Sequence, residues 1–387
     1  MSEELHIRVV RYSRRLLVAV SVAVAIMECA TASDQDLLDV IARVGPQGAG
    51  SVEARQACLK LALRDTALLP DLLVAMDTDN PVAANWYRSV FEEIVSREVT
   101  PSGIDMPMEF FKRYVSDPER SGRPRRLVLQ LINRLEPQFE TKWLLGRLDD
   151  EEFRQDAVAL VLKSGERAVQ MSDAASARRL FHQAFEHARE RSQVAAAAQH
   201  LRTLGESADV VRHLGLVTDW WFAGPFPAPH KSGFSAVFDP ETQVDLQAEY
   251  IGKSDRTFGW VRHQSDDPMG LVNLVSVLGK TDEAVAYAWT EIRLDQSREA
   301  QLRCGADDCC LVWLNGEPVS SHEQWLNGTR FDRFINPIRL NAGRNTILVK
   351  VCQGPLHRNP EVFNNWSLQL RLCDNEGRGI EFTNAVP

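Results

Sequence analysis

The residues with the clearest potential for chemistry are two adjacent aspartates, Asp307 and Asp308, in an acidic turn between two short predicted strands. Their carboxylate oxygens are hard donors that suit Ca²⁺, although this ion takes about six to eight oxygen ligands. The next loop carries three further oxygen-bearing side chains, Asn327, Asp332 and Asn336. We therefore consider a calcium site formed by Asp307, Asp308 and Asp332. The alternative is that the two aspartates only form the turn, by hydrogen-bonding their own backbone.

A second candidate for binding is Trp325, which stands in a polar segment of sequence SSHEQWLNGTR between two predicted strands. An indole in a loop can serve as a stacking platform for the face of a sugar. We place it, with Asn327, among the candidate ligand-binding residues. The alternative is that the indole caps the hydrophobic core, because large aromatic side chains are rarely left fully exposed.

Motifs for a catalytic reaction are missing from the sequence. It contains no P-loop, no Gly-x-Gly-x-x-Gly and no Gly-x-Ser-x-Gly. His182 and His187 are five residues apart, whereas ligands on one helix face are spaced by about four. A glycosidase pair is defined by the separation of two carboxylates across a cleft, which a sequence does not show. We expect no catalytic residue, and a glycoside-type hydrolase with a site at the domain junction is the enzymatic alternative.

The first 32 residues have the pattern of a secretory signal peptide. Four arginines precede an apolar run, Leu16 to Ile26, and Ala30-Thr31-Ala32 offers small residues for cleavage. The run is shorter than the roughly 20 apolar residues that span a bilayer. We predict an exported protein, periplasmic or extracellular, with no membrane span after cleavage. The alternative is an uncleaved N-terminal anchor. The four arginines are Arg8, Arg11, Arg14 and Arg15.

Cleavage after Ala32 would leave six of the seven cysteines, an even number that permits disulfides in an exported chain. Cys304 and Cys309 flank the acidic turn and could face each other across the strands. Cys352 and Cys373 should lie at opposite ends of a hairpin, too far apart to bond. The alternative is that the cysteines are buried thiols acting as small apolar residues.

Residues 33–212 read as helix, with apolar side chains recurring every three or four positions. Asn80-Pro81 marks a helix start, because Asn caps the orphan N–H groups and Pro fits the first turn. Two matching fragments near Met76 and Leu148 resemble HEAT-type helix pairs, and Ala175 to Gly205 resembles a tetratricopeptide pair. This resemblance implies a solenoid-like helical domain that offers an extended face to a protein partner.

From Trp220 onward the helical period disappears, and short strands rich in β-branched and aromatic residues follow one another between Gly and Pro breaks. This pattern favours an antiparallel sandwich over an α/β fold. The predicted strands are Asp219 to Phe226, Ala284 to Ile292, Ala300 to Arg303, Cys310 to Leu314, Pro337 to Leu340, Asn345 to Cys352 and Trp366 to Leu372.

Several motifs stand in an order that resembles the galactose-binding-like jelly rolls of many secreted bacterial enzymes and surface proteins. They are the Trp-x-x-Gly-Pro-Phe opening, Trp313-Leu-Asn-Gly316 and Leu340-Asn-Ala-Gly-Arg-Asn345. The resemblance implies a jelly roll over residues 213–387 that either holds a sugar in its loops or acts as a structural support. In related PA14-type adhesins two adjacent aspartates bind Ca²⁺, and the ion holds sugar hydroxyls. Here Cys309 follows the pair where Gly is usual in that family.

The composition is that of an ordinary globular protein, and the net charge of −9 argues against a general nucleic-acid binder. Taken together, the sequence predicts an α+β multidomain protein: a signal peptide (1–32), a helical HEAT/TPR-like domain (33–212) and a jelly-roll β-sandwich (213–387). We expect a non-catalytic binding or scaffold protein, with carbohydrate or a cell-envelope ligand at the jelly-roll loops and protein partners on the helices. A purely structural envelope protein is the remaining alternative.

Overall fold

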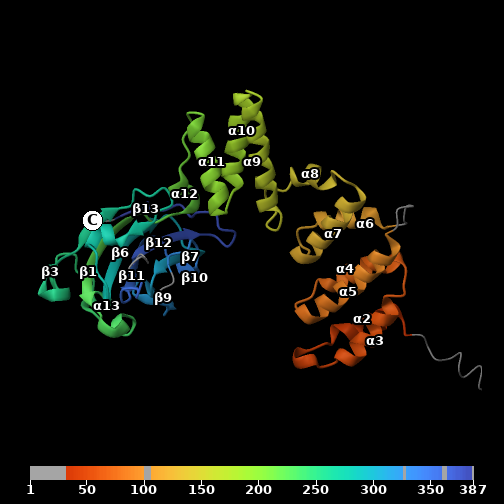
Figure 1. The fold of residues 1–387 in the computed structure, drawn as a ribbon, viewed down its shortest axis with the longest axis horizontal. Helices are drawn as coiled ribbons and strands as arrows, with labels where there is room; N and C mark the ends of the chain where they lie inside the picture. Colours follow the sequence, from red (N-terminus) through yellow and green to blue (C-terminus); the bar gives the residue numbers. More distant parts are fainter. Residues whose placement is uncertain (1–31, 100–105, 326–327, 360–363, 386–387) are drawn as a thin grey trace, which may run out of the picture. The chain divides into compact units, whose positions relative to one another are not determined.

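The computed structural model describes residues 32–99, 106–325, 328–359 and 364–385. The chain divides into two compact units, Met1–Lys142 and Trp143–Pro387, and each is described by itself. Helices occupy the N-terminal part, and the strands of the C-terminal part pair in antiparallel fashion (Figure 1). The coarse α+β prediction is confirmed. The predicted signal peptide falls almost entirely outside the described residues.

The first unit is built from short helices that pack in consecutive pairs, α2 with α3, α4 with α5 and α6 with α7. Asn80 caps α5 as predicted, since its side chain accepts hydrogen bonds from the N–H groups of Val82 and Ala83. Tyr87 and Tyr114 donate their hydroxyls to the carbonyls of Leu38 and Leu73 at 2.8 and 2.9 Å, which joins one helix to another. The helices are α2 (Asp34–Ala42), α3 (Ser51–Leu61), α4 (Leu69–Met76), α5 (Pro81–Glu98), α6 (Met108–Ser116), α7 (Gly122–Leu135) and α8 (Phe139–Leu144), which reaches into the second unit.

The second unit opens with α9 (Arg154–Gln170), α10 (Ala174–His187), α11 (Arg191–Thr203) and α12 (Val210–Leu214). Helices α9 and α10 pack closely because Gly165 has no side chain: a β-carbon there would lie 2.6 Å from Cε1 of Phe181. The small residues noted in the sequence, Ala177 and Ala184, are fully buried in this cluster.

Two larger antiparallel sheets follow. The seven-stranded sheet has the order β4-β1-β6-β11-β8-β9, with β13 added to β6, and the four-stranded sheet has the order β10-β7-β12-β5. The strands are β1 (Asp219–Pro227), β4 (Val261–Gln264), β5 (Val272–Asn273), β6 (Ala284–Leu294), β7 (Arg298–Asp307), β8 (Cys310–Leu314), β9 (Glu317–His322), β10 (Phe334–Leu340), β11 (Gly343–Gln353), β12 (Ser367–Cys373) and β13 (Thr383–Asn384). A small pair, β2 (Tyr250–Ile251) with β3 (Thr257–Phe258), lies outside both sheets.

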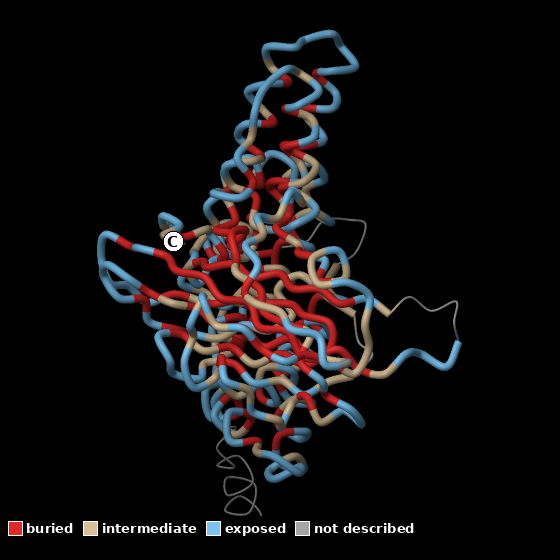
Figure 2. Tube along the Cα trace, turned by 90° about the vertical axis from the view of Figure 1, so that its left-hand side faces the viewer, coloured by how far each residue is buried: buried red, intermediate tan, exposed pale blue. Residues whose placement is uncertain are grey.

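A single hydrophobic cluster is shared by the two sheets, with side chains from β1, β6, β8 and β11 packed against others from β7, β10 and β12. Strands β6 and β12 are buried along almost their whole length, and β11 is buried over its C-terminal part. Buried stretches, red in Figure 2, run through the middle of the molecule's sheet region. The other face of the seven-stranded sheet is covered by a second cluster, rich in aromatic rings, that includes Phe226, Tyr287 and Trp289. Along its central strands, both faces of this sheet are therefore shielded from solvent.

The predicted domain boundary at 212/213 differs from the division of the structure at 142/143. The N–H of Val217 donates to the carbonyl of Leu370 at 2.9 Å, and the N–H of Leu372 donates to that of Gly215 at 2.8 Å. The segment after α12 is thus hydrogen-bonded to β12, and Met269 lies in the same apolar cluster as α9 to α11. The change from helix to strand in the sequence thus falls within the second unit.

The turns were predicted in part. Asn315 and Gly316 have φ angles of 53° and 89°, as the tight turn between β8 and β9 requires. Gly343 also has a positive φ, whereas Asn345 does not and lies fully buried in β11. Its side chain accepts a hydrogen bond from the N–H of Asn341 at 2.9 Å and donates to that residue's carbonyl at 2.9 Å. Asn345 therefore holds the turn by side-chain hydrogen bonds and not by its own backbone conformation.

The cysteines of the described residues are free thiols, so the Cys304–Cys309 disulfide is not formed, and neither is a bond between Cys352 and Cys373. Five of the six are buried, which agrees with the alternative of thiols packed as small apolar residues. Within the part of the chain that the structure describes, no helix is long and apolar enough to cross a membrane.

Candidate functional site

The acidic pair lies where β7 passes into β8, and the peptide bond between Asp307 and Asp308 is cis. Both side chains are almost completely buried, with 5% and 2% of each residue exposed. Unpaired charges are very costly in such surroundings, so the surrounding contacts decide what the pair can do.

Two loops supply backbone donors to the carboxyl groups. The N–H of Gly354 donates to Oδ2 of Asp308 at 2.8 Å, and the N–H of Gly328 donates to Oδ1 of Asp307 at 3.2 Å. The loop that carries Gly328 and Arg330 packs closely against β7 at Gly305. A β-carbon on Gly305 would overlap the carbonyl oxygen of Arg330. The pair is therefore held between the end of β11 and the segment that leads into β10.

The two carboxyl groups also interact with each other. Burial raises the pKa of Asp307 to about 7, and the hydrogen bond with Asp308 and its negative charge add to the rise. The N–H of Gly328 and the charge of Arg333 act in the opposite direction. At neutral pH a proton on Asp307 thus partly neutralises the pair, as expected for two carboxylates that share one site.

Trp325, a further candidate from the sequence, lies near this pair. A β-carbon on Gly354 would come within 3.2 Å of Cε3 of the indole and within 2.7 Å of Oδ2 of Asp308, so ring and carboxylate both lie against this glycine. Nζ of Lys231 lies 5.5 Å from the ring centroid, and Nε1 donates to Oε1 of Glu323 at 3.2 Å. The indole is half-buried against the aromatic cluster on the outer face of the seven-stranded sheet.

Asp332 does not join the pair. Its carboxylate accepts a hydrogen bond from Nε of Arg371 at 2.7 Å and one from a guanidinium nitrogen of Arg303 at 3.0 Å. Among the described residues, no group of three or more His, Cys, Asp or Glu side chains is placed to hold a metal ion. The predicted set of Asp307, Asp308 and Asp332 is therefore not assembled, because two arginines already neutralise the third carboxylate.

Of the two candidate asparagines, only Asn336 lies in the part of the chain that the structure describes. Asn327 lies outside the described residues. Asn336 is part of β10, and its Nδ2 is 3.5 Å from the carbonyl oxygen of Leu302 in the neighbouring strand. The part of the predicted site that the structure brings together is thus Asp307, Asp308 and Trp325.

Sequence reasoning missed Gly354, which contacts Asp308, and Lys231, which lies over the ring of Trp325. Gly354 follows the end of β11, and the cross-strand register of β11 with β8 runs directly toward the acidic turn. A strand predicted to end beside that turn was the available signal for Gly354. Lys231 comes from a loop more than 70 residues earlier, and nothing in the local sequence signals its position.

The chemistry of the pair suits a hard divalent cation. Two adjacent carboxyl groups that share a proton can instead share a cation, and carboxylate and backbone oxygens are the usual ligands of Ca²⁺. Asp307 and Asp308 would hold such an ion. Further oxygens would have to come from backbone carbonyls, from Asn327 or from a bound ligand, because Asp332 is engaged elsewhere.

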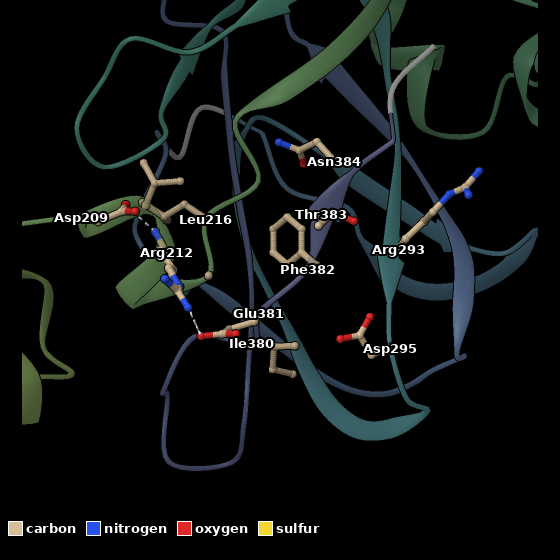
Figure 3. Close-up of a pocket in the computed structure, with 12 residues that line it drawn as sticks. Asp209, Arg212, Leu216, Arg293, Asp295, Ile380, Glu381, Phe382, Thr383 and Asn384 are labelled. Carbon is tan, nitrogen blue, oxygen red and sulfur yellow. Dashed lines mark hydrogen bonds and ion pairs between the residues drawn. The ribbon is translucent and has the colours of Figure 1, made fainter.

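A separate pocket of about 390 Å³ lies between α12, β6 and the C-terminal segment (Figure 3). Phe382 points into it, with Arg293 and Asp295 across the opening. Glu381 at its edge is paired with Arg212 at 2.5 Å. None of the residues predicted from the sequence lines this pocket, and its mixed lining has no set of groups that converge on one ligand atom.

The sequence and the structure were compared with those of known proteins. No family model matches the chain, and no curated protein matches it. Solved structures that resemble it include a β-glucuronidase from an uncultured Clostridium species (12% identity, 41% of this chain and 29% of that chain, TM-score 0.26). Others are the PA14 domain of the MpAFP antifreeze protein (16%, 45% and 87%, 0.26) and the epithelial adhesin 9 A domain from Candida glabrata in complex with Galb1-4GlcNAc (10%, 44% and 86%, 0.23). The chain spans less than a third of the β-glucuronidase, and TM-scores this low carry no argument about function.

Proposed function

We propose that the C-terminal unit is a jelly-roll module that binds carbohydrate through a calcium ion held by Asp307 and Asp308. The observation that supports this most is the convergence of two buried carboxyl groups, each fixed by a backbone N–H from a different loop, with the pKa of Asp307 raised to about 7 by burial and by Asp308. A bound Ca²⁺ would supply open coordination positions for the hydroxyl groups of a sugar. Trp325, beside the pair, would provide an apolar surface for the sugar ring.

The proposal extends to the whole chain. We propose an exported protein in which the helical HEAT/TPR-like unit is a scaffold for a protein partner. Support comes from α3, where Val52, Leu59 and the adjacent Leu63 are 63–80% exposed and recur at spacings that share one helix face. We propose a binding role and no reaction, since among the described residues around Asp307 and Trp325 no set of groups has the arrangement of a nucleophile with its base.

Calcium binding is tested by titrating the full chain with CaCl₂ in a calorimeter at pH 7, in two buffers with different heats of ionisation. We expect saturable binding of one ion with release of protons, because the ion would displace the proton on Asp307. Asp308→Ala should abolish the binding. The matched control is Glu299→Ala, which removes an exposed carboxylate paired with Arg339 on the same unit and should leave the binding unchanged.

A structural role is the second candidate function, and the burial of the pair favours it. Only 5% of Asp307 and 2% of Asp308 are exposed, and Trp325 packs against the segment at Gly354. In that case the shared proton, and not a metal ion, neutralises the pair, and the loops brace the end of the sheet. No heat of Ca²⁺ binding, together with a lower melting temperature for Asp308→Ala, would establish this role and contradict carbohydrate binding through calcium.

A further inference from the structure

Two adjacent cysteines each lie against another thiol, on opposite faces of one sheet. Successive residues of a strand point to opposite faces. Cys310 faces the core shared by the two sheets, where Cys304 also lies, and Cys309 faces the aromatic cluster on the outer side, where Cys352 lies. Interaction with Cys309 raises the pKa of the Cys352 thiol, and interaction with Cys304 raises the pKa of the Cys310 thiol, as expected for neighbouring thiols.

Cys309 directly precedes β8, and Cys352 lies in the neighbouring antiparallel strand β11. The register that pairs Cys310 with Val351 would place Cys309 opposite Cys352 if it were continued by one residue, and the N–H of Cys352 donates to the carbonyl of Cys309 at 3.0 Å. Directly opposite residues of such strands have Cα atoms about 4.5–5.5 Å apart. That range lies within the Cα separations of about 4.4–6.8 Å found for disulfides. Both side chains are fully buried, so in the folded protein neither thiol is accessible to a thiol from solution.

We propose that Cys309 and Cys352 form a disulfide bond when the chain folds under oxidising conditions. The two thiols lose two protons and two electrons and form one S–S bond. The electrons pass to a disulfide oxidant such as oxidised glutathione, which is reduced to two thiols through a mixed disulfide. Because both sulfurs are sealed by the aromatic cluster once the sheet is complete, the bond forms during folding and then resists external reductants.

The disulfide bond would restrict the conformation of the acidic turn, because both cysteines are hydrogen-bonded to residues in or near it. The N–H of Asp308 donates to the carbonyl of Cys352 at 2.8 Å, and Sγ of Cys309 donates to the carbonyl of Gln324, next to Trp325, at 3.2 Å. A covalent link at this point fixes the end of β11 to the turn, whether or not the turn binds calcium. The inference therefore stands independently of the proposed function.

Two other assignments of these sulfurs fit less well. Cys304 and Cys310 belong to strands of different sheets, so no strand pairing sets their separation. A metal site made of the cysteines is opposed by the absence, over the described ranges, of any cluster of three suitable ligands. The pair predicted from the sequence, Cys304 with Cys309, would need two side chains that point into different clusters.

The test is a peptide map of the full chain, refolded in a mixture of reduced and oxidised glutathione, alkylated and digested with trypsin without reduction. Cleavage after Arg303, Arg330, Lys350 and Arg358 places Cys304, Cys309 and Cys310 in peptide 304–330, and Cys352 in peptide 351–358. We expect the two peptides to be joined by a bond that disappears on reduction. Recovery of peptide 351–358 with an alkylated Cys352 from the refolded protein would overturn the proposal.

Two measurements assign the sulfur in the longer peptide. Cys309→Ser should abolish the cross-link, and Cys310→Ser, the matched control on the other face of the strand, should keep it. The reverse result would overturn the proposal. Fragmentation of the wild-type cross-linked peptide between Cys309 and Cys310 gives the same answer if either variant fails to fold.

Discussion

The backbone N–H of Gly354 donates a hydrogen bond of 2.8 Å to Oδ2 of Asp308, across 46 residues of sequence. That carboxylate and the indole of Trp325 both lie against this glycine and leave no room for a side chain on it. The end of β11 thus positions both the acidic turn and the neighbouring aromatic ring. A change at this glycine should therefore disturb the two proposed ligand-binding groups together.

Gly354→Ala should destabilise the protein by about 1–3 kcal/mol, the usual cost of forcing extra atoms into a packed site. The new methyl group would lie 2.7 Å from Oδ2 of Asp308. Urea unfolding at pH 7 measures the effect. Gly259→Ala is the matched control, because its nearest neighbour would be at an ordinary 3.5 Å. Equal stabilities of the two variants would show that Gly354 is not tightly enclosed.

The raised pKa of Asp307 predicts a dependence of stability on pH. Its pKa is about 7 in the folded protein, against about 3.9 in an unfolded chain. Between these values the folded state holds more protons, so the free energy of unfolding should fall as the pH rises from about 4 to about 7. Asp307→Asn should lack this fall and be more stable than the wild type at pH 8.

Urea unfolding of both proteins at pH 5 and pH 8 measures this difference. Saturating CaCl₂ should offset the loss of stability of the wild type at pH 8, since a bound cation stabilises two ionised carboxylates. The same pH dependence in Asp307→Asn would locate the responsible group elsewhere.

Asp332 is predicted to be structural. Arg371 has only 2% of its side chain exposed, and removal of the carboxylate would leave a buried guanidinium without its counter-ion. Loss of one partner of a buried pair costs about 3–5 kcal/mol. We expect Asp332→Ala to lower the free energy of unfolding by this amount without changing calcium binding per folded molecule. Glu299→Ala, which breaks an exposed pair with Arg339, should have little effect on stability.

Lys231 is predicted to compete with a sugar for the ring of Trp325, because its ammonium group lies 5.5 Å from the ring centroid. Lys231→Ala should strengthen glycan binding several-fold by leaving that side of the ring open, and Trp325→Ala should abolish it. Fluorescence titration of the full chain with a glycan that binds the wild type measures both changes. Unchanged affinity in both variants would mean that the indole is only part of the core.

Much of the fold could be predicted from the sequence because it follows from local patterns. Strand β8 was predicted at its observed bounds, and the Asn80-Pro81 helix start and the Asn315-Gly316 turn were also correct. Each depends on residues within a few positions of one another. The division of the structure at 142/143 does not coincide with the predicted boundary at 212/213, and the packing of Met269 in the cluster of α9 to α11 joins residues that are far apart in the sequence.

The site was predicted only in part for the same reason. Asp307, Asp308 and Trp325 were recognised by their types, and the structure places them side by side through Gly354. Asp332 has the same chemistry, but Arg303 and Arg371 reach it from β7 and β12. Which carboxylate is paired with an arginine and which is paired with another carboxylate depends on strand order. Strand order in turn depends on contacts between distant segments.

The most direct test of the central claim is a glycan panel probed with the full chain in CaCl₂ and again in an excess of chelator. A fragment that starts near residue 213 would be an unsuitable probe, because it would lack the helices α9 to α11, whose apolar cluster includes Met269. We predict binding that is lost in chelator and in Asp308→Ala but kept in Glu299→Ala. Binding that survives both chelator and Asp308→Ala would contradict a calcium-dependent site at Asp307 and Asp308.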